Sequence, residues 1–272
     1  MRVVELSNHP RAMLQQARQR RAVDIEPDRA RYAAALDQHR QRVAELRQAR
    51  DKARAGYRWL AWLRAAWAVA REQRRAPRPP RSLTLPSAQE EIITAGMQGE
   101  KLVATGLGRS LDSDWTLFRG YRNRGGEIDQ LLLGPGGLFA IEVKYRNATV
   151  SCDGDRWWFT RYDNQGKPVA QGELTDQRGR SPSEQVNQPA RRLEDFLRSR
   201  GHRVQIQCIV ALTHPRSRLG NCVRPTVLIV TSPAEVIGLL RGSAPRIAAD
   251  ERHQLAELII RDHQFHAKRL RS

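Results

Sequence analysis

The sequence predicts an α/β protein in which a central mixed sheet is flanked by helices and preceded by a long basic helical region. Three observations carry this prediction. Residues 29–75 contain no proline and are rich in Ala, Arg, Leu, Gln and Glu, which favour helices. A stretch rich in proline and arginine follows at 76–86 and is typical of a stiff linker. Beyond it, short apolar runs alternate with helical patterns, as they do in α/β domains.

The charge of the chain is strongly positive and unevenly spread. The formal net charge is +18 over 272 residues, which favours a polyanionic partner, either nucleic acid or an anionic membrane surface. Residues 1–82 hold 20 Lys and Arg against 8 Asp and Glu, so they carry most of the excess. We expect a basic helical extension at 1–75, a linker at 76–86 and a second domain at 87–272.

Cysteine spacing and hydropathy bear on the cellular compartment. Cys152, Cys208 and Cys222 lie far apart in the sequence, which argues against a disulfide framework or a zinc site. The N-terminus lacks the apolar core of a signal peptide. The apolar run at 59–70 is shorter than the ~20 residues that cross a bilayer, and Arg64 interrupts it. These features predict a cytoplasmic protein without a transmembrane segment.

An apolar stripe runs along the helical region at steps of three, four and seven residues. Its members are Leu36, Val43, Leu46, Ala53, Tyr57, Leu60 and Trp67. The stripe predicts a long helix or a helical hairpin that packs on the main domain, on a partner helix, or on a second copy in a homodimer. Trp59, Trp62 and Trp67, with arginines around them, would also suit a membrane interface. Packing of these rings against protein is the favoured interpretation.

The second domain reads as alternating helices and strands. Ser87 followed by Glu90 and Glu91 is typical of a helix start, and the Gly134–Gly137 stretch, GPGG, is typical of a tight turn. The polar residues at 163–181 predict a loop. The remaining expected elements are helices at 87–107, 181–200, 232–241 and 248–268, and strands at 115–120, 127–133, 138–145, 148–152, 157–162, 204–212 and 227–230.

Charged residues interrupt two of these apolar strands. Asp129 lies in the strand before the GPGG turn, and Glu142 and Lys144 lie in the strand after it. If the two strands pair antiparallel, Asp129 and Glu142 are neighbours whose carboxylates repel unless a cation lies between them. Mg²⁺ takes oxygen ligands of this kind, and a nearby ammonium can hold water or balance charge on a phosphate. The pattern indicates metal-dependent phosphodiester hydrolysis; a simple surface pair of Glu142 with Lys144 is the alternative.

The order and spacing of several short motifs resemble the nuclease-related domain (NERD) family, a branch of the PD-(D/E)xK nuclease superfamily. The resemblance covers about residues 90–215. The matching motifs are Gly96-Met97-Gln98-Gly99-Glu100, Gly126-Glu127-Ile128-Asp129, Gly134-Pro135-Gly136-Gly137-Leu138-Phe139, Ile141-Glu142-Val143-Lys144, Asp153-Gly154-Asp155-Arg156-Trp157 and Ser181-Pro182-Ser183-Glu184-Gln185. The family often has an Asn-aromatic pair and then Gly after the lysine, where this chain has Tyr145-Arg146-Asn147. That departure leaves the choice of substrate open.

The resemblance implies a nuclease-like fold and a magnesium-dependent endo- or exodeoxyribonuclease, with Mn²⁺ as a possible substitute. Asp129 and Glu142 match the metal ligands, and Lys144 matches the catalytic lysine. Glu100 matches an acid that assists at the metal, and Gln185 matches a glutamine that borders the site. A surface position for Glu100 and a capping role for Gln185 remain alternatives.

Four arginines are candidates for contacts with the phosphates of nucleic acid, which is expected to be DNA: Arg124, Arg146, Arg191 and Arg192. A solvated helix face is the alternative for Arg191 and Arg192. Glu127 is expected to be an exposed strand charge or the partner of Arg124. Two other functions stay open beside the nuclease: a non-catalytic nucleic-acid-binding protein, and a membrane-surface scaffold that keeps the nuclease fold.

Overall fold

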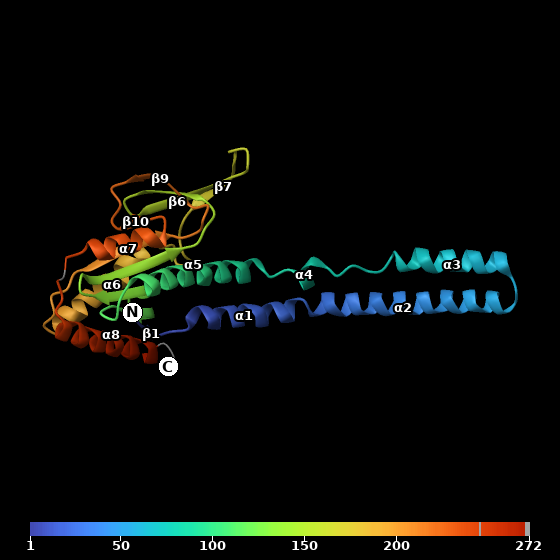
Figure 1. Cartoon of the computed structure of the whole chain (residues 1–272), viewed down its shortest axis with the longest axis horizontal. Coiled ribbons are helices and arrows are strands. Elements are labelled where there is room, and N and C mark those ends of the chain that lie inside the picture. The colour runs from blue at the N-terminus through green and yellow to red at the C-terminus, as the bar shows by residue number, and fades with distance from the viewer. Residues whose placement is uncertain (245, 270–272) are drawn as a thin grey trace. The chain divides into compact units, whose positions relative to one another are not determined.

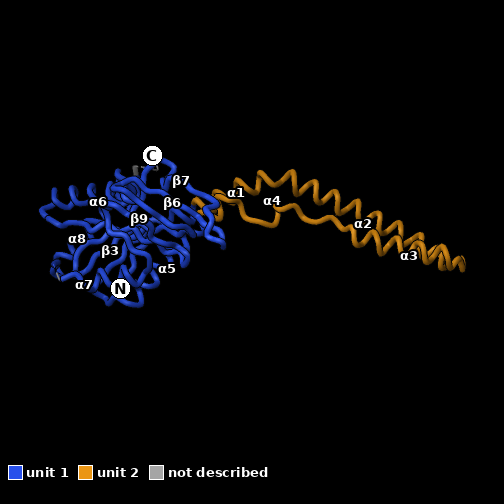
Figure 2. The backbone as a smooth tube through the Cα atoms, turned by 90° about the horizontal axis from the view of Figure 1, so that it is seen from above, with its two compact units in different colours: residues 1–12, 93–272 blue, residues 13–92 orange. Residues whose placement is uncertain are grey.

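A computed structural model describes residues 1–244 and 246–269 (Figure 1). The chain divides into two compact units, residues 1–12 together with 93–272, and residues 13–92 (Figure 2). The first residues belong to the larger unit because strand β1 (Arg2–Glu5) pairs in parallel with β2 (Thr116–Asn123). This division differs at the start of the chain from the expected helical extension, since local composition gives no sign of a pairing across more than a hundred residues.

The larger unit is built on a mixed sheet, as the sequence predicts. In the described residues its strand order is β1-β2-β3-β4-β8-β10. Strands β2, β3 (Gly126–Gly134) and β4 (Gly137–Lys144) are antiparallel neighbours. Strand β8 (Ile206–Leu212) runs parallel to β4, and β10 (Leu228–Val230) runs parallel to β8. Strand β4 is therefore central and buried, as its near-continuous apolar sequence predicts.

Helices cover both faces of this sheet (Figure 1). The core on one face joins side chains of α5 (Ala88–Ser110) and α7 (Pro233–Gly242) to β3 and β4. The core on the other face joins α6 (Pro182–Ser199) and α8 (Ala249–Arg269) to the same strands. Apolar residues alternate between the two cores along β4, because successive strand side chains point to opposite faces. The prediction of a sheet flanked by helices is confirmed.

A second, smaller sheet has the strand order β7-β6-β5-β9. Strands β5 (Thr149–Asp153) and β6 (Arg156–Tyr162) are the pair that the sequence predicts. The prediction of a loop over 163–181 is wrong in part, because β7 (Pro168–Glu173) pairs with β6 there. Strand β9 (Arg218–Val223) was not predicted either. Both are polar edge strands, so they lack the apolar run that reveals a strand.

The smaller unit contains a helical hairpin. Helix α2 (Glu26–Ala55) and helix α3 (Trp59–Gln73) run side by side, and the chain reverses at Tyr57, whose φ of 53° lies in the left-handed region. His39 Nδ1 and Glu72 Oε1 face each other across the hairpin at 3.6 Å. This is the hairpin alternative of the sequence analysis. Helices α1 (His9–Asp24) and α4 (Arg81–Thr84) complete the helices before α5, and α4 lies inside the expected linker.

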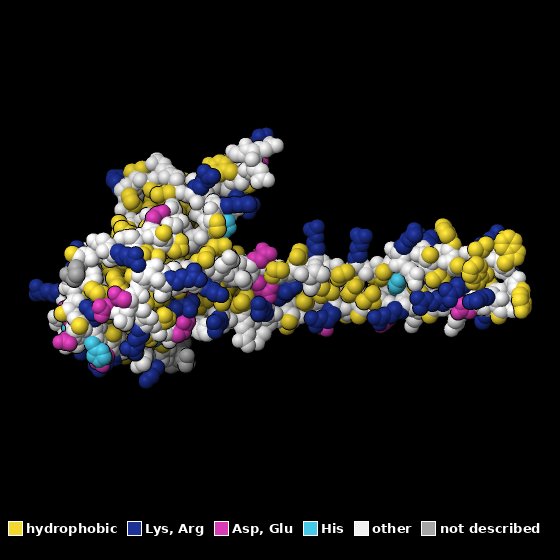
Figure 3. Space-filling model, viewed as in Figure 1, with side chains coloured by type: hydrophobic (Ala, Val, Ile, Leu, Met, Phe, Trp, Pro, Cys, Tyr) yellow, Lys and Arg dark blue, Asp and Glu magenta, His cyan; other side chains and the backbone are white. Residues whose placement is uncertain are grey.

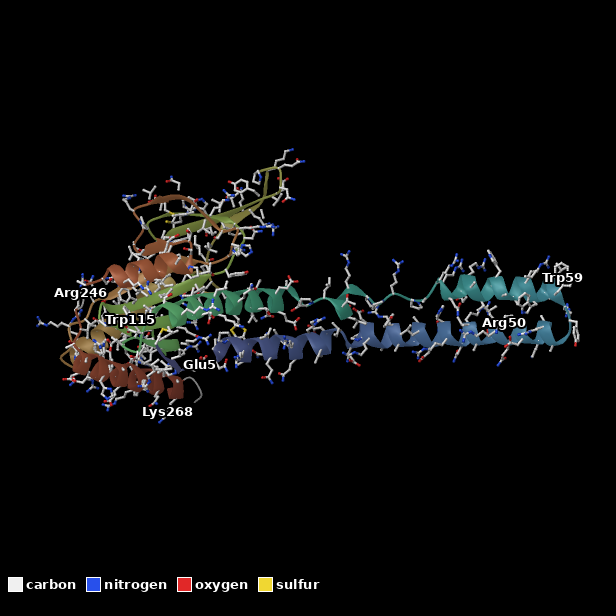
Figure 4. All side chains as sticks on the ribbon, in the orientation of Figure 1. Glu5, Arg50, Trp59, Trp115, Arg246 and Lys268 are labelled. Carbon is white, nitrogen blue, oxygen red and sulfur yellow. The ribbon has the colours of Figure 1, made fainter. Side chains whose placement is uncertain are left out.

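The tryptophans of the hairpin point outward. Trp59 is 66 % exposed, Trp67 is 67 % exposed and Tyr57 is exposed at the turn; Figure 4 labels Trp59 at the end of the hairpin. The less exposed face of α3 carries small side chains, among them Ala61, Ala65 and buried Val69. Within the described residues, Trp59 and Trp67 therefore expose their rings, and packing of these rings against a partner protein stays a prediction. Over the residues described, no helix is long and apolar enough to cross a membrane.

Candidate active site between helices α5 and α6

The β3–β4 hairpin sets the register of the acidic residues. Its last pairs are Gly134 with Gly137 at the turn and Gln130 with Ile141 at the far end. One residue further along, Asp129 and Glu142 stand on adjacent strands, as the predicted antiparallel pairing requires. Glu142 is only 5 % exposed because β3 and β8 flank β4. A buried charge needs close partners, so its surroundings decide whether the site is structural or chemical.

The Asp129 side chain accepts a backbone hydrogen bond at the point where the two strands separate. Its Oδ2 accepts the N–H of Val143 at 2.8 Å, beyond the last regular pair of the hairpin. Burial raises the pKa of Asp129 well above its usual value, and the carboxylates of Glu142 and Glu100 raise it further. The carboxyl group is thus fixed in place but unfavourably charged, which a nearby cation would relieve.

Lys144 joins the acidic group to helix α6. Its Nζ donates to Glu142 Oε1 at 2.6 Å and to Gln185 Oε1 at 2.8 Å. Burial alone lowers the pKa of Lys144, but the carboxylates of Glu142 and Asp129 outweigh it, so the pKa is raised. Lys144 is therefore a permanent cation here. An ammonium has three donors, so one remains for a water molecule or a phosphate oxygen.

Gln185 is held by the first turn of α6. Its Nε2 donates to the carbonyl of Arg180 at 2.7 Å, which fixes the amide so that Oε1 faces Lys144. The capping role that was the alternative for Gln185 belongs to Ser181 and Glu184, which form a capping box at the start of the helix. Gln185 therefore does not cap the helix, and its side chain bonds to Lys144 instead.

Two motifs that lie far apart in the sequence, Asp153–Trp157 and Ser181–Gln185, meet at this first turn. Ser183 Oγ donates to Asp155 Oδ1 at 2.6 Å and accepts from Trp157 Nε1 at 3.0 Å. The second sheet thereby anchors the start of α6, two residues before Gln185. Sequence reasoning singled out both motifs but missed that they touch, since no local pattern reports a contact across 28 residues. Trp157 is buried in the core.

Glu100 reaches the acidic group from α5 on the other side. Its backbone carbonyl accepts from Gln130 Nε2 at 2.6 Å, which ties α5 to β3. Burial raises the pKa of Glu100 to about 7; Arg119 opposes the shift, and Glu127 and Glu142 add to it. The surface-residue alternative is excluded for Glu100, because its side chain is largely buried beside other carboxylates.

The acidic side chains gathered here are carboxylates, the type of ligand that a divalent cation takes. Among the described residues, no three His, Cys, Asp or Glu side chains are already arranged to hold a metal ion. In this arrangement the Lys144 ammonium bonds to Glu142 and the Val143 amide bonds to Asp129. Burial first, and neighbouring carboxylates second, raise the pKa of Asp129 and of Glu100. Carboxylate oxygens are the ligands that Mg²⁺ and Mn²⁺ prefer.

Glu127 and the four candidate arginines fall in different places. Glu127 pairs with Arg122, so the expected pairing with Arg124 is wrong. Arg124 and Arg192 line one hollow together, and Arg191 joins them in it. Arg146 lies elsewhere: its guanidinium stacks on the ring of Phe159 in the second sheet, 3.8 Å from the ring centroid. The structure therefore groups three of the four.

Comparison with known proteins gives one finding about the family. Residues 95–213 match the model of the family described as the nuclease-related domain, or NERD. The match spans all the residues discussed for the acidic group, from Glu100 to Gln185. No curated protein and no solved structure matches the chain.

Proposed function

We propose that the nuclease-related domain of this chain is a divalent-metal-dependent nuclease that hydrolyses the phosphodiester bonds of DNA. One observation carries the proposal: three carboxyl groups and a charged lysine converge between α5 and α6, from elements that are distant in sequence. Stability does not account for this group, because neighbouring carboxylates raise the pKa of Asp129 and of Glu100 and so oppose folding at neutral pH. Such clusters of perturbed acids are typical of functional sites.

Each residue has a distinct role in this proposal. Asp129 and Glu142 hold the metal, with Mg²⁺ as the physiological ion and Mn²⁺ as a substitute, and Glu100 assists from α5. The bound ion supplies a Lewis acid for a phosphoryl oxygen and lowers the pKa of a coordinated water. Lys144 donates to the attacking water or to the phosphate, because its raised pKa keeps it protonated. Gln185 keeps the Lys144 ammonium aimed at the site.

Contacts to the DNA backbone come from arginine side chains in this proposal. Arg124, Arg191 and Arg192 share one hollow of the larger unit, and Arg146 stands two residues beyond Lys144. The basic hairpin supplies further non-specific attraction for phosphates. A cytoplasmic location suits these partners and the three free cysteines.

The test is cleavage of supercoiled, linear and single-stranded DNA with Mg²⁺ or Mn²⁺. Wild type should cut, whereas Asp129→Ala and Lys144→Ala should each lose at least 100-fold in rate, on the order expected for a metal ligand or an essential charged donor. Gel-shift binding of the same DNA checks that the variants still fold. If wild type binds DNA but never cuts it with either metal, the non-catalytic binding function replaces the nuclease.

A second candidate function, attachment to a membrane surface, is favoured by the end of the hairpin. Figure 3 shows hydrophobic side chains gathered there beside Lys and Arg side chains. Trp59, Leu60 and Trp67 are exposed, and Arg58 and Arg64 lie among them. Tryptophan with arginine suits the headgroup region of an anionic bilayer. Flotation of the whole chain with anionic vesicles, compared with a Trp59→Ala/Trp67→Ala variant, tests this candidate; no flotation of wild type would remove it.

A further inference from the structure

Two neighbouring hollows of the larger unit are lined in part by residues of α6. The first, which we name the aromatic pocket, has a volume of 420 Å³ and contains Arg124, Arg192, Phe196, Arg200, Arg261 and Phe265 among its lining. The second, the arginine pocket, has a volume of 480 Å³ and contains Arg124, Arg178, Arg180, Gln188, Arg191 and Arg192. Arg124 and Arg192 line both hollows, so the two adjoin, and we name the pair the groove. Volumes of this size are typical of ligand sites.

The groove carries positive charge that the protein itself does not neutralise. Asp262 of the aromatic pocket accepts the hydroxyl of Tyr121 and stands 3.5 Å from His266, so it faces partners of its own. Asp195 of the arginine pocket pairs with Arg198. Across the part of the chain that the structure describes, no carboxylate pairs with Arg124, Arg191, Arg192, Arg200 or Arg261. An anionic ligand is the natural complement of such a surface.

Two aromatic side chains, Phe196 and Phe265, line the aromatic pocket. Phe196 is half-buried on α6 and packs on the core, whereas Phe265 on α8 is 54 % exposed. The Phe265 ring stands edge-on to His266, with 5.1 Å between the ring centroids. Arg200 covers the ring of Phe196 at 5.5 Å. Aromatic rings beside arginines are the combination on which unpaired bases stack in single-strand-binding proteins.

One face of α6 connects this groove to the candidate active site. Gln185, Gln188, Arg192 and Phe196 follow one another at steps of three, four and four residues, so they lie along one face. The eleven residues from Gln185 to Phe196 span ~16 Å at the rise of an α-helix. Arg180, which lines the arginine pocket, also contacts the candidate active site. Its carbonyl accepts from Gln185 Nε2, and its Nη1 donates to the carbonyl of Gly125 at 3.0 Å.

We propose that this groove binds single-stranded nucleic acid, with phosphates on its arginines and one unpaired base stacked in the aromatic pocket. The inference deepens the proposed function because it names the strand form of the substrate. It rests on that function in one respect, that the bound strand leads toward Lys144. A duplex supplies phosphates but keeps its bases stacked inside, so only a single strand uses both features of the groove.

The test measures binding apart from cleavage. Fluorescence anisotropy with labelled single-stranded and duplex DNA is run on the Lys144→Met background in a chelator, so that no strand is cut. Phe265→Leu, which keeps apolar bulk but removes the ring, should weaken single-strand binding about tenfold and leave duplex binding unchanged. Phe265→Trp should restore it. Arg192→Gln should weaken both forms and lower the slope of log K against log salt by about 1.

Arg246→Gln is the matched control. Figure 4 labels this exposed residue, and its backbone N–H bonds to Pro135 at the turn of the β3–β4 hairpin, the opposite end from Asp129. Its loss should leave the affinity for single strands within twofold. A series of oligonucleotides with one abasic position each adds a second readout: one position should lose affinity in wild type but not in Phe265→Leu.

The outcomes separate this inference from the proposed function. Equal affinity for single strand and duplex, with no effect of Phe265→Leu or of any abasic position, overturns the single-strand groove even if the protein cuts DNA. Ring-dependent binding of single strands supports the groove even if no metal produces cleavage. In that case the nuclease proposal fails by itself.

Discussion

At the scale of single residues, the acidic group shows how a site opposes the stability of its own fold. Asp129, Glu142 and Glu100 lie close together. With them lie the Lys144 ammonium, which bonds to Glu142, and the Arg119 guanidinium, which lies 3.8 Å from Glu100. Burial raises the pKa of Asp129 and of Glu100, and neighbouring carboxylates raise both further. Hydrophobic side chains of similar size would pack there at lower free-energy cost. Such a group of acids with shifted pKa values is typical of a functional site.

This conflict predicts a particular dependence of stability on pH. The pKa of Glu100 is about 7 in the folded chain and 4.5 in the unfolded chain, so the folded state holds the proton more tightly. The free energy of unfolding should therefore fall as pH rises from 4.5 to 7, and the loss should persist above 7. Glu100→Gln removes this loss and should stabilise the metal-free protein at pH 8 by on the order of 2 kcal/mol. Urea unfolding at pH 5 and pH 8 measures it.

Two comparisons make that measurement decisive. Glu173→Gln changes an exposed strand carboxylate paired with Arg156, and should follow wild type at both pH values. Addition of Mg²⁺ should narrow the gap between wild type and Glu100→Gln, because a bound cation favours the ionised carboxylates. Parallel pH profiles for wild type and Glu100→Gln would show that Glu100 is not part of a repelling group.

At the scale of elements, the close approach of α5 to β4 depends on one glycine. A Cβ on Gly99 would lie 2.8 Å from Tyr145 Cβ, 2.9 Å from Thr213 Oγ1 and 3.1 Å from Val143 Cγ1. Gly96 is one turn earlier in the same helix, and nothing lies within 4 Å of its Cβ position. The motif glycines thus differ in purpose: Gly99 allows α5 to bring Glu100 to the strand, and Gly96 does not.

A pair of alanine variants tests this difference. Gly99→Ala should destabilise the protein by about 1–3 kcal/mol through overpacking. It should also lower the rate of DNA cleavage by displacing Glu100. Gly96→Ala should stabilise it by about 0.5–1 kcal/mol, because alanine restricts the unfolded chain and meets no neighbour in the helix. Thermal unfolding of the two variants is the measurement. Equal effects on the melting temperature would refute the close approach.

The elements that the sequence predicted are those whose signal is local. The β3–β4 hairpin follows from two apolar runs and a GPGG turn, and this hairpin alone brings Asp129 beside Glu142. The capping box at Ser181 likewise predicts the start of α6. The bond of Lys144 to Gln185 and the bond of Ser183 to Asp155 depend on tertiary packing, which periodicity does not report. Strand β1 was missed because four residues form a strand only when a partner supplies hydrogen bonds.

At the scale of the whole molecule, the charge of the hairpin is less uniform than the net charge suggests. Much of α2 carries arginines paired with acids three residues away, such as Arg29 with Glu26 and Arg40 with Asp37. Near the turn, Lys52, Arg54 and Arg58 are exposed and pair with no carboxylate among the described residues. Exposed i,i+3 pairs add little stability, so their main effect is to neutralise charge. The turn is therefore one place where free positive charge is exposed, and the other end of α3, with exposed Arg71, Arg74 and Arg75, is another.

This distribution predicts how the whole chain responds to salt when it binds duplex DNA. Each phosphate contact contributes about −0.9 to the slope of log K against log salt. If the turn contacts the backbone, Lys52→Gln/Arg54→Gln/Arg58→Gln should reduce the magnitude of the slope by about 2 to 3. A double variant that neutralises Arg29 together with Glu26 keeps the net charge and should leave the slope unchanged. An unchanged slope in the triple variant would remove the turn from DNA binding, and its exposed tryptophans would then argue for the membrane surface instead.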